Sequence, residues 1–168
     1  MSDVAPFDPE RLLRALTKHR VKFVLIGALA ARLHGFPRFT ADADITPATD
    51  KANLEHLAAA LKDLHAKVYT ESVPEGLPFD VSAATLARAR MWKLVTDAGR
   101  LDIAFEPAGV DGYTDLKKDA EDFEAFGVRF LVASLDDIIR SKEATGRAKD
   151  ADDVIVLKAL KKMRSRAT

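Results

Sequence analysis

Apolar and polar positions alternate along this chain with two periods, and each period predicts one type of element. Apolar residues that recur every three or four positions, as at Leu12, Leu13 and Leu16, predict the buried stripe of an amphipathic helix. Short runs rich in β-branched residues, as at positions 21–26, predict strands. Helices are therefore expected at residues 9–20, 28–34, 51–64, 134–145 and 150–163, and strands at 21–26, 41–46, 68–70, 92–96, 101–105 and 126–132.

Residues with strong local preferences mark the ends of these elements. Asp8 is an expected N-cap for the first helix, and Ser134 opens a capping box that begins a later one. Gly146 is expected to end that later helix, because glycine adopts the left-handed conformation that closes a helix. Asp150 and Asp153 are interpreted as caps of the last helix.

Turn residues divide the middle of the chain. Asp97-Ala98-Gly99 separates two strand-like runs and predicts an antiparallel hairpin, in which Trp92 is interpreted as a core anchor rather than a base-stacking platform. Residues 72–79 contain two prolines and a glycine and form the most loop-like segment. That segment is expected to be either a substrate-facing loop or a plain connector.

The order of elements predicts an α/β (α+β) fold, with a mixed sheet, flanking helices and a C-terminal helical segment. A chain of 168 residues is long enough for one domain with a hydrophobic core. We expect a single domain over residues 1–168, with its core at about 20–133 and its C-terminal helices at about 134–164.

Composition excludes several functional classes. The chain has no cysteine, which rules out disulfides and thiolate zinc sites and favours a cytoplasmic location. Its longest apolar stretch, residues 21–33, is interrupted by Lys22, Gly27 and Arg32, and it falls short of the roughly 20 residues that span a bilayer. The first nine residues lack the basic region of a signal peptide. No membrane association is expected.

The charges balance, with 26 basic and 26 acidic residues, so the whole molecule is not expected to attract nucleic acid. Five cations nevertheless crowd the last eleven residues: Lys158, Lys161, Lys162, Arg164 and Arg166. They could contact phosphates, or they could simply complement the dipole of a solvated helix end. The four histidines lack metal-ligand spacing and are assigned no role.

Two aspartates lie on one face of the strand expected at 41–46. Side chains alternate along a strand, so Asp42 and Asp44 project together while Ala43 and Ile45 point to the other side. Two carboxylates this close repel each other unless a cation lies between them. The pair is therefore a candidate seat for a divalent metal ion.

A third acid is expected on the second strand of the hairpin. Leu101 and Ile103 share an apolar face, which leaves Asp102 on the opposite one, with Glu106 as a reserve candidate. If this strand lies beside the first, three carboxylates converge, as required to bind two magnesium ions roughly 3.5 to 4 Å apart. Gly27, at a strand-to-helix turn, would let a phosphate approach the backbone, or it is only a turn glycine.

These features resemble a known family. The run VLIGALAARLHGFPRFTADADI is similar to the start of the minimal nucleotidyltransferases that act as toxins in abortive-infection and type IV toxin-antitoxin systems. Their Arg-x-Thr-x-Asp-x-Asp pattern falls on Arg38, Thr40, Asp42 and Asp44. Their third acid falls on Asp102 in WKLVTDAGRLDI, and their Lys-x4-Arg-x-Lys-Asp segment lies within SLDDIIRSKEATGRAKDADDV.

The resemblance implies a nucleotidyltransferase fold and the transfer of a nucleoside monophosphate from a nucleoside triphosphate to an acceptor, with Mg²⁺ or Mn²⁺. The implied acceptor is RNA, such as a tRNA 3′ end, and a cognate antitoxin protein is an implied partner. Asp42, Asp44 and Asp102 would bind the metals, and Asp102 would also help to withdraw the acceptor's proton. The implied nucleotide-binding residues are Gly27, Ala28, Arg38, Thr40, Lys142, Arg147 and Lys149.

Two alternatives remain open. An enzyme of the same fold could nucleotidylate a small molecule or a protein, which the neutral net charge favours. A catalytically inactive module could use the fold to bind a nucleotide or a partner. Ala28 motivates this second alternative, because many nucleotidyltransferases have a serine there that hydrogen-bonds a triphosphate oxygen.

Overall fold

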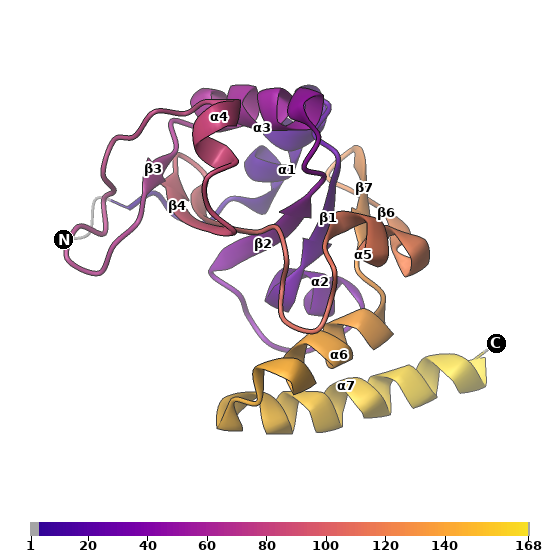
Figure 1. The fold of residues 1–168 in the computed structure, drawn as a ribbon. Coiled ribbons are helices and arrows are strands. Elements are labelled where there is room, and N and C mark those ends of the chain that lie inside the picture. The colour runs from indigo at the N-terminus through magenta and orange to yellow at the C-terminus, as the bar shows by residue number, and fades with distance from the viewer. Residues whose placement is uncertain (1–3, 168) are drawn as a thin grey trace.

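A computed structural model describes residues 4–167 of the chain (Figure 1). The helices are α1 (Pro9–Lys18), α2 (Gly27–Leu33), α3 (Lys51–Asp63), α4 (Ala83–Leu86), α5 (Tyr113–Asp119), α6 (Leu135–Thr145) and α7 (Ala148–Ala167). The strands are β1 (Phe23–Ile26), β2 (Asp42–Pro47), β3 (Lys67–Val68), β4 (Met91–Thr96), β5 (Gly99–Ala104), β6 (Glu121–Ala125) and β7 (Val128–Val132). The expected α/β class is confirmed.

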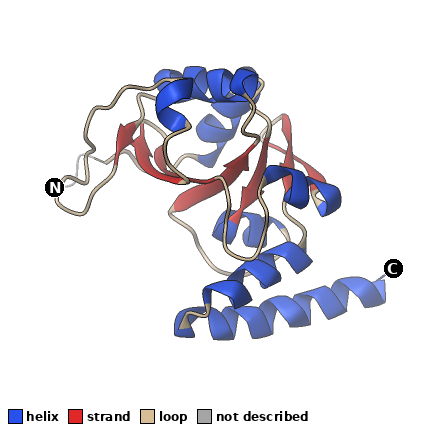
Figure 2. Ribbon diagram, viewed as in Figure 1, coloured by secondary structure: helices blue, strands red, loops and turns tan. Residues whose placement is uncertain are grey.

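All seven of these strands form one mixed sheet in the order β3-β4-β5-β2-β1-β7-β6 (Figure 2). Two neighbouring pairs, β1 with β7 and β2 with β5, are parallel, and the remaining pairs are antiparallel. The order places β2 and β5 side by side near the centre of the sheet. The strands that carry the candidate acids are therefore neighbours, as the sequence analysis required.

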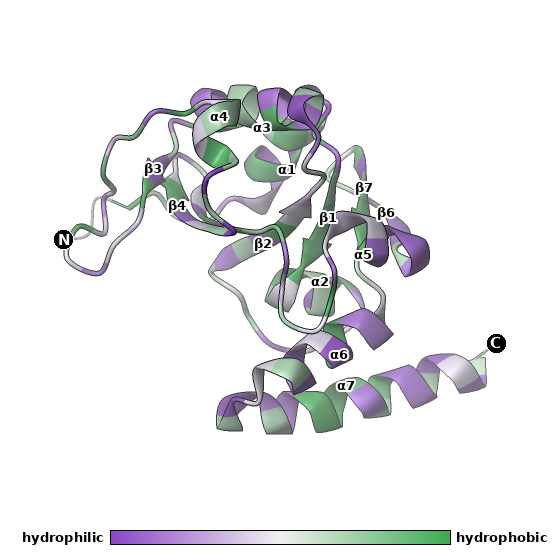
Figure 3. Cartoon of the chain, viewed as in Figure 1, coloured by the Kyte–Doolittle hydropathy of each residue, from purple (hydrophilic) through white to green (hydrophobic). Residues whose placement is uncertain are grey.

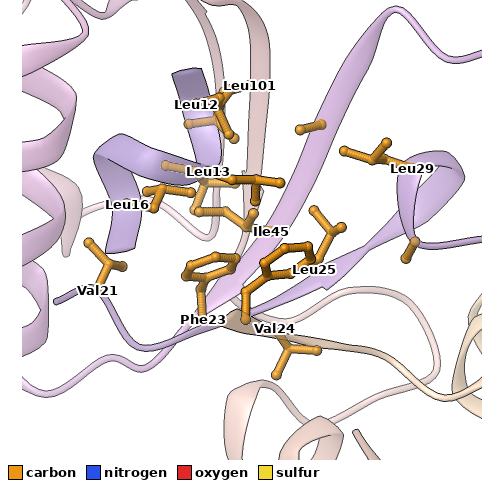
Figure 4. Close-up of a cluster of buried hydrophobic side chains, with 14 of the residues drawn as sticks. Leu12, Leu13, Leu16, Val21, Phe23, Val24, Leu25, Leu29, Ile45 and Leu101 are labelled. Carbon is orange, nitrogen blue, oxygen red and sulfur yellow. The ribbon is translucent and has the colours of Figure 1, made fainter. Parts of the chain in front are cut away.

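Helices cover both faces of the sheet and bury its central strands. Figure 1 shows α1, α3 and α4 toward one side, and α2, α6 and α7 toward the other. The leucine stripe of α1 is fully buried and lies beside Phe23 and Ile45 (Figure 4). Because helices lie on both sides, Phe23, Val24 and Leu25 of β1 are all buried, which explains its unbroken apolar run. In Figure 3, apolar positions gather in the sheet and polar ones mark the outer helices.

The predicted end signals are mostly confirmed. The side chain of Asp8 accepts a hydrogen bond from the Arg11 backbone N–H, and Ser134 accepts one from that of Asp137. Gly146 ends α6 with a positive φ of 62°. Helices and strands that were predicted begin and end within a few residues of the expected positions.

Three elements were not predicted, and one interpretation was wrong. The unpredicted elements are α4, α5 and β6, which are short or carry few apolar residues. The strand expected at 126–132 begins at Val128, because Phe126 and Gly127 adopt positive φ values and form the turn from β6. Asp150 and Asp153 are not caps, because α7 begins at Ala148 and both residues lie within the helix. Their side chains are buried and form ion pairs.

Among the helices of residues 4–167, none is both long enough and apolar enough to cross a bilayer.

Candidate active site

The three predicted carboxylates lie on adjacent strands. β2 and β5 run parallel with Asp44 directly opposite Asp102, and Asp42 lies opposite Arg100. The strand alternation holds as expected: Ala43 and Ile45 are fully buried, while the aspartates are partly exposed on the other face. The expectation that the two strands lie side by side is thus confirmed, and it brings the three acids to one surface of the sheet.

Burial and repulsion act together on Asp44. Its pKa is raised from 3.8 to about 7, first by burial and then by the negative charges of Asp42 and Asp102. The cations Arg100 and Lys142 oppose this rise only in part. A carboxylate in such surroundings is stabilised in its charged form when a cation approaches.

Arg100 was missed by the sequence analysis and lies among the acids. Its guanidinium Nη2 is 3.4 Å from Asp102 Oδ1, and its plane covers the Tyr69 ring at 3.6 Å. Burial raises the pKa of Asp102, and the charge of Arg100 opposes that rise. Strand alternation offered a signal, because residue 100 must share a face with residue 102.

Gly27 has a structural reason to be glycine. A Cβ atom at this position would lie 2.4 Å from Asp44 Oδ2, and the backbone has a φ of +72°. Asp44 therefore packs directly against the start of α2, in space that a side chain would fill. Both features make any other residue unfavourable here.

Thr40 orients the first aspartate from the loop before β2. Its hydroxyl Oγ1 is 2.9 Å from the Asp42 carbonyl oxygen and 3.2 Å from Asp42 Oδ1. Thr40 does not line the cavity described next, so the structure places it behind a carboxylate rather than against a ligand.

A cavity of about 620 Å³ lies over the three carboxylates. Its walls come from β2 and β5, the start of α2, the segment at 107–110, α6 and the start of α7. Its size suits a nucleotide. Apart from Thr40, it is lined by every residue that the sequence analysis assigned to the site: Gly27, Ala28, Arg38, Asp42, Asp44, Asp102, Lys142, Arg147 and Lys149.

Three of the four cationic side chains that line the cavity form ion pairs with two aspartates of α7. Lys142 Nζ lies 3.3 Å from Asp150 Oδ1 and 3.2 Å from Asp153 Oδ2. Arg38 pairs with Asp153 at 2.8 Å, and Arg147 with Asp150 at 2.8 Å. Sequence reasoning missed this network because it interpreted Asp150 and Asp153 as helix caps, and because the pairing of Arg38 with Asp153 spans 115 residues of the chain.

The charge balance of the cavity favours a metal-bound anion over a free one. Six aspartates and four cationic side chains line it, so its lining is net negative. A free triphosphate would be repelled, whereas divalent cations would reverse the sign. Within residues 4–167, however, no three His, Cys, Asp or Glu side chains already surround a common ion position. The donor chemistry fits magnesium, but Asp102 is turned toward Arg100 rather than toward a closed ligand set.

The remaining candidates lie elsewhere. Glu106 is 58% exposed and pairs with Arg90, and neither it nor any residue of 72–79 lines the cavity, which favours the connector interpretation of that segment. Trp92 stacks on Phe79 and donates a hydrogen bond to the Leu86 carbonyl, as suits a packing residue.

The basic C-terminal residues also lie away from the cavity. Lys158 pairs with Glu143, Lys161 with Asp136, and Arg164 with Glu121. The buried His34 contacts the Ala133 carbonyl at 2.8 Å and Arg164 at 2.6 Å, so it joins α7 to the sheet. These contacts indicate a structural role for Lys158, Lys161, Arg164 and His34.

Comparison with known proteins identifies the fold. No protein-family model matches the chain, and no curated protein matches its sequence significantly. Among solved structures, it is similar to a protein from Thermotoga maritima described as a nucleotidyltransferase, with a TM-score of 0.56 and 19% identity over 89% of this chain and 93% of the other. It is also similar to the lincosamide antibiotic adenylyltransferase LnuA in its lincomycin-bound structure, with a TM-score of 0.58 and 14% identity over 92% and 99% of the two chains. The chain therefore has the nucleotidyltransferase fold.

Proposed function

We propose that this protein transfers a nucleoside monophosphate from a nucleoside triphosphate to an acceptor hydroxyl, with Mg²⁺ as cofactor and Mn²⁺ as a substitute. The observation that carries the proposal is the position of Asp42, Asp44 and Asp102. They come from two adjacent strands and line one cavity together with four cationic side chains. The fold, shared with the adenylyltransferase LnuA, is consistent with this chemistry.

The reaction forms a bond from the acceptor oxygen to the α-phosphorus and breaks the bond between that phosphorus and the bridging oxygen, so pyrophosphate leaves. Bound magnesium would neutralise the phosphate oxygens and lower the pKa of the acceptor hydroxyl. Asp42 and Asp44 would hold the metal, with Thr40 orienting Asp42. Asp102 would complete the ligand set and help to take the acceptor's proton.

The cationic wall would hold the triphosphate. Arg147 and Arg38 can each bind a phosphate through two parallel hydrogen bonds, whereas Lys142 and Lys149 act as point charges. Lys142 also lowers the pKa of Asp44, which places its charge within electrostatic range of the carboxylates. The backbone at Gly27 and Ala28 lines the same cavity and would approach the phosphates without a serine hydroxyl.

For the acceptor we propose RNA, such as the 3′ end of a tRNA, with the protein acting in the cytoplasm as the toxin of a toxin-antitoxin pair. This proposal rests on the Arg-x-Thr-x-Asp-x-Asp run and the Lys-x4-Arg-x-Lys-Asp segment. A cognate antitoxin protein would then be its partner.

A small-molecule acceptor is the second candidate. Two observations favour it: the net charge is zero, and the fold extends over nearly all of LnuA, an adenylyltransferase of an antibiotic. RNA-binding proteins usually present a basic field, which this chain lacks as a whole.

The donor and acceptor can be tested together. Each of the four nucleoside triphosphates, labelled at the α-phosphate, is incubated with the protein and either total tRNA or a small-molecule extract, with Mg²⁺ or with a chelator. We expect Mg²⁺-dependent label in the RNA fraction. Label only in the small-molecule fraction would replace the RNA acceptor with the second candidate.

Absence of transfer under every condition would point to an inactive nucleotide- or partner-binding module, for which Ala28 is the motivating residue. Calorimetry with Mg²⁺ and each triphosphate then decides whether the cavity binds nucleotide at all. Binding that depends on Asp44 would support a nucleotide-binding role.

A further inference from the structure

Asp153 joins two cations of the cavity that come from distant parts of the chain. It lies on α7 and is 5% exposed. Its Oδ2 accepts a hydrogen bond from Arg38 Nη1, in the loop before β2, at 3.1 Å, and another from Lys142 Nζ on α6 at 3.2 Å. A single buried carboxylate therefore fixes the separation of an arginine and a lysine that line the same wall.

Asp150, one helical turn earlier, binds the other side of the network. It accepts hydrogen bonds from Lys142 at 3.3 Å, Arg147 at 2.8 Å and the Thr145 hydroxyl at 2.9 Å. Lys142 thus lies between two carboxylates, whereas Arg38 is paired with Asp153 alone among the acidic residues that the structure describes. Asp153 is therefore the charged partner of Arg38, whose Cζ also lies 5.6 Å from the centre of the Phe36 ring.

A long, exposed cationic side chain needs a partner to keep it in one conformation. Arg38 is 59% exposed and could otherwise sample many rotamers. Ordering a long cationic side chain when a ligand binds lowers the affinity for that ligand. Asp153 orders it before the ligand arrives.

We propose that Asp153 is a positioning residue for triphosphate recognition: it presets Arg38 and Lys142 at the spacing that the β- and γ-phosphates require. This inference rests on the proposed function. Asp153 does not contact the substrate; it acts through the two cations, which keep donor groups free for phosphate oxygens.

If only its charge mattered, replacing Asp153 would raise the affinity for triphosphate, whereas the positioning role predicts a lower affinity. The direction of the change in affinity therefore distinguishes the two effects. Removing one negative charge from a net-negative cavity should strengthen the binding of an anion. Losing the preset position of two side chains should weaken it. We expect the positioning effect to exceed the charge effect, because the ion pairs are short and Asp153 is buried, whereas the cavity is open to screening solvent.

The test compares Asp153→Asn with a matched control on the same helix. Asp152→Asn removes the same charge from the neighbouring position, where the side chain is exposed. Calorimetry measures the binding of the Mg²⁺ complexes of α,β-methylene ATP, CTP, GTP and UTP, and of the matching monophosphates, to both variants and to the wild-type protein. Asp44→Asn serves as the control for the proposed function.

We expect Asp153→Asn to weaken triphosphate binding by about tenfold while monophosphate binding changes by less than about twofold. Asp152→Asn should bind both ligands as the wild type does. A purely structural role for Asp153 would reduce the affinity for both ligands equally, and that result would overturn the inference. So would unchanged or tighter triphosphate binding by Asp153→Asn.

Arg38→Gln provides a second variant should Asp153→Asn fold poorly. It breaks the same ion pair from the exposed side and should also lose affinity for triphosphate selectively. The two substitutions combined should cost less than the sum of their separate effects, because both remove one interaction. Additive losses, or an Arg38→Gln variant that binds triphosphate as the wild type does, would overturn the inference.

Failure of the proposed function gives a different pattern. In that case the wild type binds no triphosphate, or Asp44→Asn binds it as tightly as the wild type does. Failure of the inference alone leaves Asp44-dependent triphosphate binding intact and insensitive to position 153.

Discussion

At the scale of single residues, Asp44 is placed where its own charge is unfavourable. Its pKa of about 7 lies well above the ordinary value because burial and two neighbouring carboxylates oppose ionisation. The folded protein therefore binds a proton more tightly than the unfolded chain does. Without a metal, this site lowers stability wherever Asp44 must ionise.

The consequence is a pH-dependent free energy of unfolding in metal-free buffer. As the pH rises from about 4 to about 7, the unfolded chain loses its proton first, so stability should fall by about 2 to 4 kcal/mol from this group. Asp44→Asn should flatten this part of the profile, and Mg²⁺ should reduce the loss in the wild type. Urea unfolding at several pH values measures the free energy of unfolding of both proteins. Identical pH profiles for the wild type and Asp44→Asn would contradict the raised pKa of Asp44.

Gly27 can be tested against a glycine with nearly the same φ angle. Gly27 and Gly127 have φ values of 72° and 74°, but a Cβ at Gly127 would meet only Arg14 Nη2, at 3.5 Å. Gly127→Ala should cost about 1 to 2 kcal/mol of stability from backbone strain alone. Gly27→Ala should cost more and should also impair nucleotide transfer, because its Cβ collides with Asp44.

Thermal unfolding and transfer assays on the two glycine variants separate these effects. Equal losses of stability with full transfer activity in both would show that Asp44 does not depend on the space at Gly27.

At the scale of elements, α7 connects the fold to the site. Its buried residues are Asp150, Asp153 and Leu157, so Leu157 is its one fully enclosed apolar anchor among the described residues, beside two ion-paired acids. Val154 and Leu160 pack against the core only in part. Leu157→Ala should cost about 2 to 5 kcal/mol of stability. It should also weaken triphosphate binding, because the acids that order the cations move with the helix.

Ile155→Ala is the matched control, since Ile155 is 67% exposed on the same helix. It should change the free energy of unfolding by less than about 0.5 kcal/mol. Chemical denaturation and nucleotide binding check both variants; equal behaviour would mean that α7 is not anchored through Leu157.

Local features of these elements could be predicted from the sequence, whereas contacts between distant segments could not. Strand alternation predicted the face of its own strand on which each of Asp42, Asp44 and Asp102 lies, because alternation is a local rule. The pairing of the two strands was only a condition at that point, and the structure shows that it is met. The edge strand β6 was not predicted, because its sequence, Glu-Asp-Phe-Glu-Ala, buries little apolar area. The interpretation of Asp150 and Asp153 as caps failed because α7 already begins at Ala148. Their carboxylates instead pair with cations, of which Arg38 lies 115 residues before Asp153 in the chain.

At the scale of the whole molecule, the balanced charge bears on the acceptor. With no net field, RNA would have to bind through local phosphate contacts. If RNA is the acceptor, its KM should rise at least about tenfold between about 50 and 200 mM salt, because phosphate contacts release counterions. A neutral small-molecule acceptor should show little change, so kinetics over this range separates the two candidates.

The proposed nucleotidyl transfer requires three carboxylates that act together with divalent cations. The most direct test is the initial rate of nucleotidyl transfer as Mg²⁺ is varied, for the wild type, Asp42→Asn, Asp44→Asn, Asp102→Asn and the exposed control Asp152→Asn. We predict that each of the three site variants loses at least about a hundredfold in rate, while the control keeps the wild-type rate and Mg²⁺ dependence. Transfer that persists at the wild-type rate in any one of the three, or that proceeds equally well in a chelator, would contradict it.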